Sequence, residues 1–592
     1  MRELEYPFDG DYILKKKKTL KRLLIENGNS FIEKNIAILG GSTTNDIKNL
    51  IELFLLNQGI KPNFYESEYN MYYQDAMFPN PELEAFKPDV IYIHTTNRNI
   101  TSYPSVSNTP EEVEVSLNNE YHKFESIWER LKKVYKCPII QNNFELPYYR
   151  LMGNKEASSI YGKVNYITRL NLKFYEYAEK EENMHICDIN YISSSYGLEK
   201  WSDQFYWHMY KYALAVPAIP YLAFNVANII KAIFGKNKKG FVLDLDNTLW
   251  GGIVGDDGVE GIAIGPEVPS GQVFSEFQNY LKEYAGLGVI LNVDSKNEKD
   301  NAIAGLNHPD GVLKPDDFVV IKANWEPKSQ NLVNIANELN LGVDSLVFVD
   351  DNPAEREIIR QQVPGVAVPE MTKPEEYISI IDKSGFFETV NLSKDDLRKT
   401  QMYKENAKRN EDMASFADYG DYLKSLNMKA QIKPFEEIYM SRIAQLTNKS
   451  NQFNLTTKRY TQSEIEEVSK SNDYIEIYGK LEDKFGDNGV VSVVIGKKNG
   501  EELDIDLWIM SCRVLKRDME FAMMDTLVKK ASQNGIKRIK GFYYPTAKNM
   551  MVKSFYDMQG FEKVSEDESG NTIWNLNIDS YTRKNKYIEV ED

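Results

Sequence analysis

Cysteine is scarce in this chain of 592 residues, which contains three: Cys137, Cys187 and Cys512. They lie far apart and form no CxxC pair, which argues against a disulfide framework or a zinc site and predicts a reducing, cytoplasmic location. Basic residues are also few relative to acidic ones. The chain has 71 Lys and Arg and 88 Asp and Glu, which gives a net charge of -17. Because nucleic-acid binding needs a basic field, we expect no nucleic-acid partner.

Long uninterrupted apolar runs are also missing. The N-terminal segment has no apolar stretch of signal-peptide length before its charges. The longest apolar stretch, roughly Tyr210 to Ile233, contains Pro217 and Pro220. Prolines in these positions favour a packed helical segment over a membrane span. We therefore expect no segment that crosses a membrane.

The length exceeds what one hydrophobic core usually holds and predicts three domains in an α/β multidomain fold. Residues 1–235 alternate apolar strands with helical stretches and indicate a doubly wound α/β domain. Residues 236–390 contain four short apolar runs typical of a buried parallel sheet. Residues 391–592 begin with a polar helical stretch and continue as an α+β domain, with a hairpin predicted at Asn499-Gly500. The expected strands are 35–39, 89–94, 241–245, 288–293, 318–321, 345–349, 490–495, 503–510, 536–544 and 572–578. The expected helices are 46–56, 393–410, 518–533 and 546–558.

Pairs of carboxylates follow two of the expected central strands. Asp244 and Asp246 end the run FVLDLD, and Asp350 and Asp351 end SLVFVDD. The carboxyl ends of parallel strands face one crevice, so we expect these side chains to meet. Buried like charges require a cation, and oxygen ligands suit Mg²⁺, which also binds substrate phosphate. Ser295 and Lys328, which lie between the two pairs, can hold phosphate oxygens.

The order DLDNT, strand-end serine, lysine and DD resembles the haloacid-dehalogenase (HAD) superfamily of phosphatases. The resemblance implies that Asp244 is the nucleophile that forms an aspartyl-phosphate. It implies that Asp246 is the acid and base, that Ser295 and Lys328 hold the phosphate, and that Asp350 orients Lys328. It also implies that Mg²⁺ is bound by Asp244, the backbone carbonyl of Asp246, and Asp351. The roles of Asp350 and Asp351 could be exchanged.

Longer strings give a narrower resemblance, to the FkbH-like family. They are DLDNTLWGGIVGDDG, SKNEKDNA, WEPKSQN, FVDDNPAERE, NKSNQFNLTTKRYT and SCRVLKRDME. The resemblance covers nearly the whole chain. It implies transfer of a glyceryl unit from 1,3-bisphosphoglycerate to the thiol of an acyl carrier protein, with loss of phosphate. The family usually has a cysteine before the SKN string, where this chain has Asp294, so we predict no enzyme thioester on the central domain.

The flanking domains resemble two further families. Residues 391–592 resemble a GNAT acyltransferase, although both glycines of that family's R-x-x-G-x-G/A loop are replaced, by Lys516 and Asp518. Residues 1–235 resemble an SGNH hydrolase. Its nucleophile would be Ser42, its oxyanion donor Asn97, and its base pair Asp203 and His208. The spacing departs from that family's pattern, which argues against an active hydrolase site, and a histidine packed among aromatic side chains is the alternative interpretation of His208.

Three functions remain open from the sequence. The leading one is an HAD-type enzyme with Mg²⁺ that couples phosphoryl transfer to loading a C3 acyl unit onto a carrier protein. The second is a plain HAD phosphatase that acts on a small phosphorylated metabolite. The third is a non-catalytic scaffold with decayed flanking domains.

Overall fold

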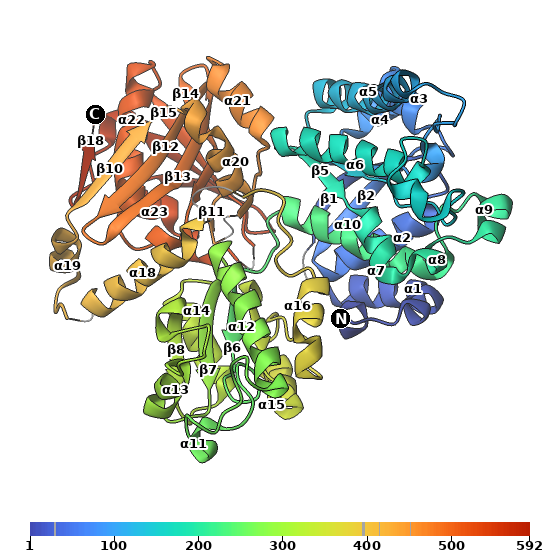
Figure 1. The fold of residues 1–592 in the computed structure, drawn as a ribbon. Coiled ribbons are helices and arrows are strands. Elements are labelled where there is room, and N and C mark those ends of the chain that lie inside the picture. The colour runs from blue at the N-terminus through green and yellow to red at the C-terminus, as the bar shows by residue number, and fades with distance from the viewer. Residues whose placement is uncertain (29–30, 393–396, 414, 450–451, 547, 592) are drawn as a thin grey trace. The chain divides into compact units, whose positions relative to one another are not determined.

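The computed structural model describes residues 1–592 except 29–30, 393–396, 414, 450–451, 547 and 592 (Figure 1). The chain forms two compact units. The first comprises Met1–Asn237 together with Lys383–Asn391, and the second comprises Lys238–Asp382 together with Leu392–Asp592. The chain therefore leaves the first unit and returns to it, whereas residues 383–390 were expected in the central domain.

The first unit contains a five-stranded sheet in which every pairing is parallel. The strand order is β2-β1-β3-β4-β5, the order of a doubly wound domain whose direction reverses between β1 and β3. Buried apolar residues run through β1, β3 and β4 on both faces, as expected for a sheet covered by helices on each side. The strands are β1 Ile32–Gly40, β2 Ile60–Glu66, β3 Val90–His94, β4 Ile139–Asn142 and β5 Met184–Cys187.

Helices cover both faces of this sheet (Figure 1). α1 (Gly10–Asn27), α2 (Asn45–Asn57) and α10 (Ile219–Ile233) pack on one face, and α5 (Pro110–Tyr135) and α6 (Lys163–Lys180) on the other. Among the described helices, Val216–Ile233 alone is long and apolar enough to cross a membrane, but 72% of it is buried. Its prolines occupy helix first turns, where proline is tolerated, so they begin the helix and do not break it.

The central part of the second unit is a four-stranded parallel sheet in the order β8-β7-β6-β9. α14 (Lys328–Glu338) and α15 (Pro353–Gln362) pack against it, with their apolar residues in one cluster. The carboxyl ends of neighbouring β6, β7 and β9 place the predicted catalytic residues at one edge. The strands are β6 Gly240–Leu243, β7 Ile290–Ser295, β8 Phe318–Ala323 and β9 Leu346–Val349.

The remaining part of the second unit contains a nine-stranded mixed sheet in the order β16-β17-β15-β14-β13-β12-β10-β18, with β11 paired to β14. The predicted hairpin is present, with Gly500 in the left-handed region at φ 62°. α22 (Met519–Gln533) then connects β14 to its parallel neighbour β15. The strands are β10 Met428–Lys433, β11 Phe453–Asn454, β12 Tyr474–Asp483, β13 Gly486–Asn499, β14 Glu502–Met510, β15 Arg538–Tyr543, β16 Glu562–Glu566, β17 Thr572–Asn577 and β18 Ile588–Glu591.

Two expected helices differ from the structure. The stretch expected at 393–410 is α18 (Lys399–Met413), and residues 393–396 of that prediction lie outside the described part. The helix expected at 546–558 is a short turn and a short helix, η10 (Met550–Val552) and α23 (Phe555–Gln559), while residue 547 is not described. The amide of Asn549 donates to the backbone carbonyls of Asn454 and Tyr544, and such side-chain bonds compete with a helix start.

Candidate active site

Three carboxylates gather where β6 and β9 end. Asp244, Asp350 and Asp351 each offer an oxygen atom within 4.8 Å of the others. Asp244 and Asp350 are buried and Asp351 is partly buried. Burial raises the pKa of Asp350 and of Asp351 above the usual range, and the negative charge of Asp244 adds to both shifts. The site therefore concentrates negative charge in a poorly solvated place.

Lys328 is the cation inside this cluster. It is the first residue of α14, and its ammonium lies 2.9 Å from Asp244 and 2.6 Å from Asp350. Its side chain is 3% exposed. Burial alone lowers the pKa of a lysine, but the two carboxylates outweigh this and hold the Lys328 pKa above its usual value. The contact with Asp350 is the one that the HAD resemblance implies for orienting the lysine.

Asp246 is fixed by three hydrogen bonds. The indole N–H of Trp250 and the backbone N–H of Val254 donate to its Oδ1 at 2.9 and 3.0 Å. The amide of Asn297 donates to its Oδ2 at 2.9 Å. Burial raises the pKa of Asp246 and outweighs the bonds from Val254 and Trp250, which lower it. A carboxyl that is both oriented and more basic than usual suits an acid and base.

Ser295 and Asp294 end β7, next to β6. Ser295 is 2% exposed at the carboxyl end of the strand. Asp294 is fully buried, and its Oδ1 accepts a 3.1 Å bond from the amide of Asn331. Its Oδ2 has no hydrogen-bond partner among the described residues. Burial raises the pKa of Asp294 to about 8, so near neutral pH it is mostly a neutral acid.

The donor set fits a hard divalent cation. The Asp244, Asp350 and Asp351 oxygens are close enough to share one ion, and Lys328 offsets only part of their charge. A role for the Asp246 carbonyl as a ligand stays a prediction. Sequence reasoning missed the amide and indole groups that orient the acids: Trp250, Asn297 and Asn331. Asn297 belongs to the SKN string, which was its signal in the sequence.

Comparisons with known proteins show which family the chain resembles. A family model described as FkbH, N-terminal domain, matches residues 35–231. A solved structure from Bacteroides fragilis, the N-terminal part of BF1531 containing a phosphatase domain complexed with Mg, is 31% identical. The match has a TM-score of 0.59 and covers 63% of this chain and 99% of that chain. The chain belongs to the FkbH-like family. It is thus an enzyme of HAD-phosphatase type. Among curated proteins, none matches.

Two acetyltransferase structures are also similar to part of this FkbH-like protein. The ribosomal-protein-S18-alanine N-acetyltransferase of Escherichia coli is 13% identical, with a TM-score of 0.21, over 27% of this chain and 99% of its own. A GNAT-family acetyltransferase of Streptococcus pneumoniae is 12% identical, with a TM-score of 0.22, over 25% and 99%.

The loop before α22 keeps an unusual backbone in this FkbH-like chain. Lys516 and Asp518, which stand at the two glycine positions of the GNAT loop, have φ of 66° and 61°. This left-handed region is costly for residues with a Cβ. Arg513 and Arg517 are both 6% exposed and bond inside the protein, Arg517 to Asp483 at 3.0 Å. Arg513 and Arg517 are therefore engaged internally, whereas Lys516 is exposed.

The first-unit candidates are not joined into a triad. Ser42 follows β1, and its buried hydroxyl has no hydrogen-bond partner among the described residues. Asp203 caps α9 (Gln204–Tyr210) by accepting from the backbone N–H groups of residues 205 and 206. His208 is exposed on α9, so the packed aromatic environment considered for it is not present. The described residues show no hydrogen bond between any two of Ser42, Asp203 and His208.

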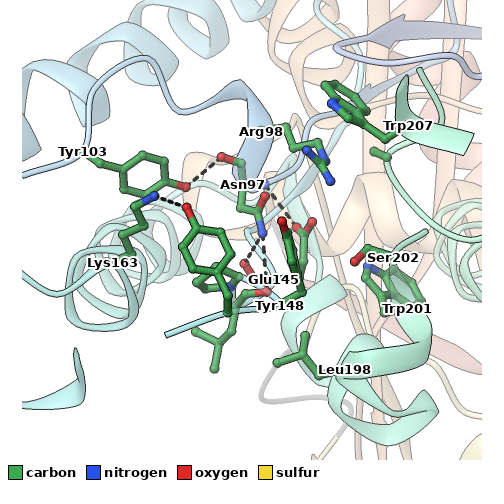
Figure 2. Close-up of a pocket in the computed structure, with 14 residues that line it drawn as sticks. Asn97, Arg98, Tyr103, Glu145, Tyr148, Lys163, Leu198, Trp201, Ser202 and Trp207 are labelled. Atoms are coloured by element: carbon green, nitrogen blue, oxygen red, sulfur yellow. Dashed lines mark hydrogen bonds between the residues drawn. The ribbon is translucent and has the colours of Figure 1, made fainter. Parts of the chain in front are cut away.

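Asn97, the predicted oxyanion donor, lies in the wall of a cavity (Figure 2). Its side-chain amide donates to the backbone carbonyls of Glu145 and Leu146 at 3.3 and 3.4 Å. Its backbone N–H donates to the carboxyl of Glu145 at 3.2 Å. Because these donors already have acceptors, Asn97 holds the loop after β4 in this structure and is not an open oxyanion donor.

Proposed function

We propose that the protein is a Mg²⁺-dependent enzyme that releases phosphate from a phosphorylated C3 acid and loads the acyl unit onto a carrier-protein thiol. The observation that carries the phosphoryl-transfer part is the buried contact of Lys328 with both Asp244 and Asp350, beside Asp351. A nucleophile, a phosphate-holding cation and a divalent-ion site then meet at one sheet edge. We propose that it acts in the cytoplasm.

In the proposed phosphoryl transfer, Asp244 attacks the phosphorus of the ester, and the bond from phosphorus to the leaving oxygen breaks. Asp246 gives its proton to that oxygen and later takes one from the water that cleaves the aspartyl-phosphate. Ser295 and Lys328 hold the phosphate oxygens. Mg²⁺, bound by Asp244 and Asp351 with Asp350 beside them, would neutralise phosphate charge.

In the proposed loading step, a carrier thiol attacks the carbonyl carbon of an acyl phosphate such as 1,3-bisphosphoglycerate. The C–S bond forms, the C–O bond to phosphate breaks, and the thiol proton goes to the departing phosphate. Asp294 supports direct transfer, because a carboxyl group at this position cannot form an enzyme thioester. Of the cysteines, Cys137 and Cys187 are buried in the first unit, and Cys512 is partly exposed.

The test is the intact mass of a candidate acyl carrier protein after incubation with the enzyme, Mg²⁺ and 1,3-bisphosphoglycerate. A glyceryl mass on the carrier, together with released phosphate, is the expected result. Asp244→Asn replaces the nucleophile with a near-isosteric amide, so release of the ester phosphate should fall at least about a thousandfold. Turnover of this variant within tenfold of wild type would contradict the aspartyl-phosphate. Chelation should stop turnover and Mg²⁺ restore it.

Two outcomes would favour one of the other two functions. Phosphate release with an unloaded carrier favours the plain phosphatase, which acts on a small phosphorylated metabolite. No phosphate release from any phosphorylated C3 acid favours the scaffold. Mass spectrometry of enzyme quenched during turnover separates the routes of loading. A hydroxylamine-sensitive adduct on Cys512 would overturn direct transfer, whereas a loaded carrier without any cysteine adduct supports it.

A further inference from the structure

A cavity of about 250 Å³ lies in the first unit (Figure 2). Its lining residues belong to a different sheet and its loops from those that carry Asp244. Its walls come from η2 (Asn97–Asn99) after β3, from residues 145–149 after β4, and from α8 (Leu198–Trp201) and α9. In doubly wound sheets, ligands bind outside the carboxyl ends of the strands. The position is therefore one where this fold class holds small molecules.

Two cations line this cavity without a close ion pair to a carboxylate. Arg98 donates to the side-chain oxygen of Gln204 at 3.1 Å, and Lys163 donates to the hydroxyl of Tyr149 at 2.6 Å. Within the described residues, neither has an Asp or Glu oxygen within 4.0 Å, although acidic residues exceed basic ones in this chain by 17. Glu145, which also lines the cavity, attracts Arg98 from beyond that distance, but burial disfavours its charge. Two partly buried cations that face one partly ionised acid make an electropositive pocket in an acidic protein.

Aromatic rings supply the other walls. The Arg98 guanidinium lies 4.2 Å from the ring centroid of Trp207, and Lys163 lies 5.0 Å from that of Tyr103. Stacking on an aromatic face leaves the edge of a guanidinium free for a bidentate contact with an anion. Tyr148 and Tyr149 are 54% and 44% exposed at the cavity, which gives a planar or apolar group a surface to pack on.

Glu145, the acidic residue in the cavity wall, does not prevent an anion from binding there. Glu145 is 3% exposed, and burial raises its pKa to about 7, so it carries only part of a charge near neutral pH. When protonated it can donate a hydrogen bond. The two cations therefore dominate the field inside the cavity.

We propose that this cavity binds a small organic anion with a planar or apolar body, whose acidic group pairs with Arg98 and whose body packs on the tyrosines. Lys163 provides the second positive group. A carboxylate and a phosphate ester share this chemistry. The site is independent of the phosphoryl-transfer site, so its ligand need not be the substrate proposed above.

The test is calorimetric titration of the full-length protein, without divalent metal, using benzoate, phenyl phosphate and the uncharged benzyl alcohol. At least one anion should bind about tenfold more tightly than benzyl alcohol. Which anion binds distinguishes a carboxylate site from a phosphate-ester site. Arg98→Gln should weaken that binding at least about tenfold, and Lys163→Gln should weaken it severalfold. Arg22→Gln, at an exposed position on α1, is the matched control and should change nothing.

Several results would overturn the proposal: benzyl alcohol binding as tightly as the anions, no saturation below about 10 mM for any probe, or unchanged binding in Arg98→Gln. Phenyl phosphate binding that survives Arg98→Gln would occur at another site and would overturn a phosphate-ester site in this cavity. Circular dichroism and thermal unfolding establish that each variant is folded. If Arg98→Gln does not fold, Lys163→Gln decides the question, and unchanged anion binding in that variant overturns the proposal.

Discussion

At the scale of single residues, the stability of the central site depends on Lys328. Its ammonium offsets the buried charges of Asp244 and Asp350. Lys328→Met keeps the stem and removes the charge, which leaves the carboxylates without their internal partner. Removing one partner of a buried ion pair costs about 3 kcal/mol or more. We expect a lower melting temperature, and a larger stabilisation by Mg²⁺ than in wild type.

The control is Lys322→Met on β8, which removes a surface pair with Glu338 and should cost less than about 1 kcal/mol. Thermal unfolding with and without Mg²⁺ measures both variants. Equal melting temperatures for Lys328→Met and wild type would show that the lysine is not needed to neutralise the acids.

Glu145 makes the first unit sensitive to pH. Its carboxyl titrates near the usual 4.5 in the unfolded chain but near 7 when folded, because burial disfavours the charge. Between these values the folded state binds more protons, so stability is lost as pH rises through this window. Glu145→Gln removes the titration. Relative to wild type, the variant should gain up to about 3 kcal/mol between pH 4 and pH 8, measured by denaturant unfolding. A constant difference across that range would contradict the buried ionisation.

The acids of the central site were predictable because they follow apolar strands, and strand ends converge in a parallel sheet. Asp244, Asp350 and Asp351 do meet in the structure. The groups that orient them were not predicted, since a hydrogen-bond donor such as Trp250 or Asn297 has no sequence period. The two cations of the cavity in the first unit, Arg98 and Lys163, were missed for a similar reason: only the fold shows which charges lack a close ion pair.

At the scale of elements, α18 is tied to the mixed sheet by a buried ionic cluster. The side chain of Asp483, at the end of β12, is fully buried and accepts from Arg409 of α18 at 2.7 and 2.8 Å and from Arg517 at 3.0 Å. Asp483→Asn leaves two buried guanidinium groups without a counter-charge. This change should cost about 3–5 kcal/mol of unfolding free energy.

Glu501→Gln is the matched control, because its pair with Lys537 is 66% exposed on both sides and worth less than about 1 kcal/mol. Chemical denaturation of both variants measures the difference. A loss of less than 1 kcal/mol for Asp483→Asn would mean that the cluster does not hold α18 to the sheet.

Which elements could be predicted depended on their apolar pattern. The buried strands β6–β9 are short apolar runs and were found within a few residues. β16 has five exposed residues and gave no such signal. The helix expected at 546–558 failed because Asn549 uses its side chain to bind backbone carbonyls, a tertiary contact that helix periodicity does not reveal.

At the scale of the whole molecule, the two compact units keep their candidate sites on separate sheets. Ser42→Ala removes the buried hydroxyl in the first unit. We expect phosphate release at the Asp244 site to stay within about twofold of wild type, because no chemistry at that site uses Ser42. A phosphate assay on both proteins checks this. A strong loss of activity would show that the first unit takes part in the reaction.

The return of Lys383–Asn391 to the first unit also determines how the chain carries mechanical load. Lys231 donates to the carbonyl of Gly385 at 2.7 Å, and Asn237 donates to that of Glu388. A force applied between the two ends of the chain enters the first unit near Met1 and leaves it after Asn391. That covalent path bypasses residues 238–382, so the two ends of this segment are not pulled apart until the returning segment detaches. In a stretched molecule, tension should therefore reach the catalytic sheet through its own backbone only after the first unit begins to open.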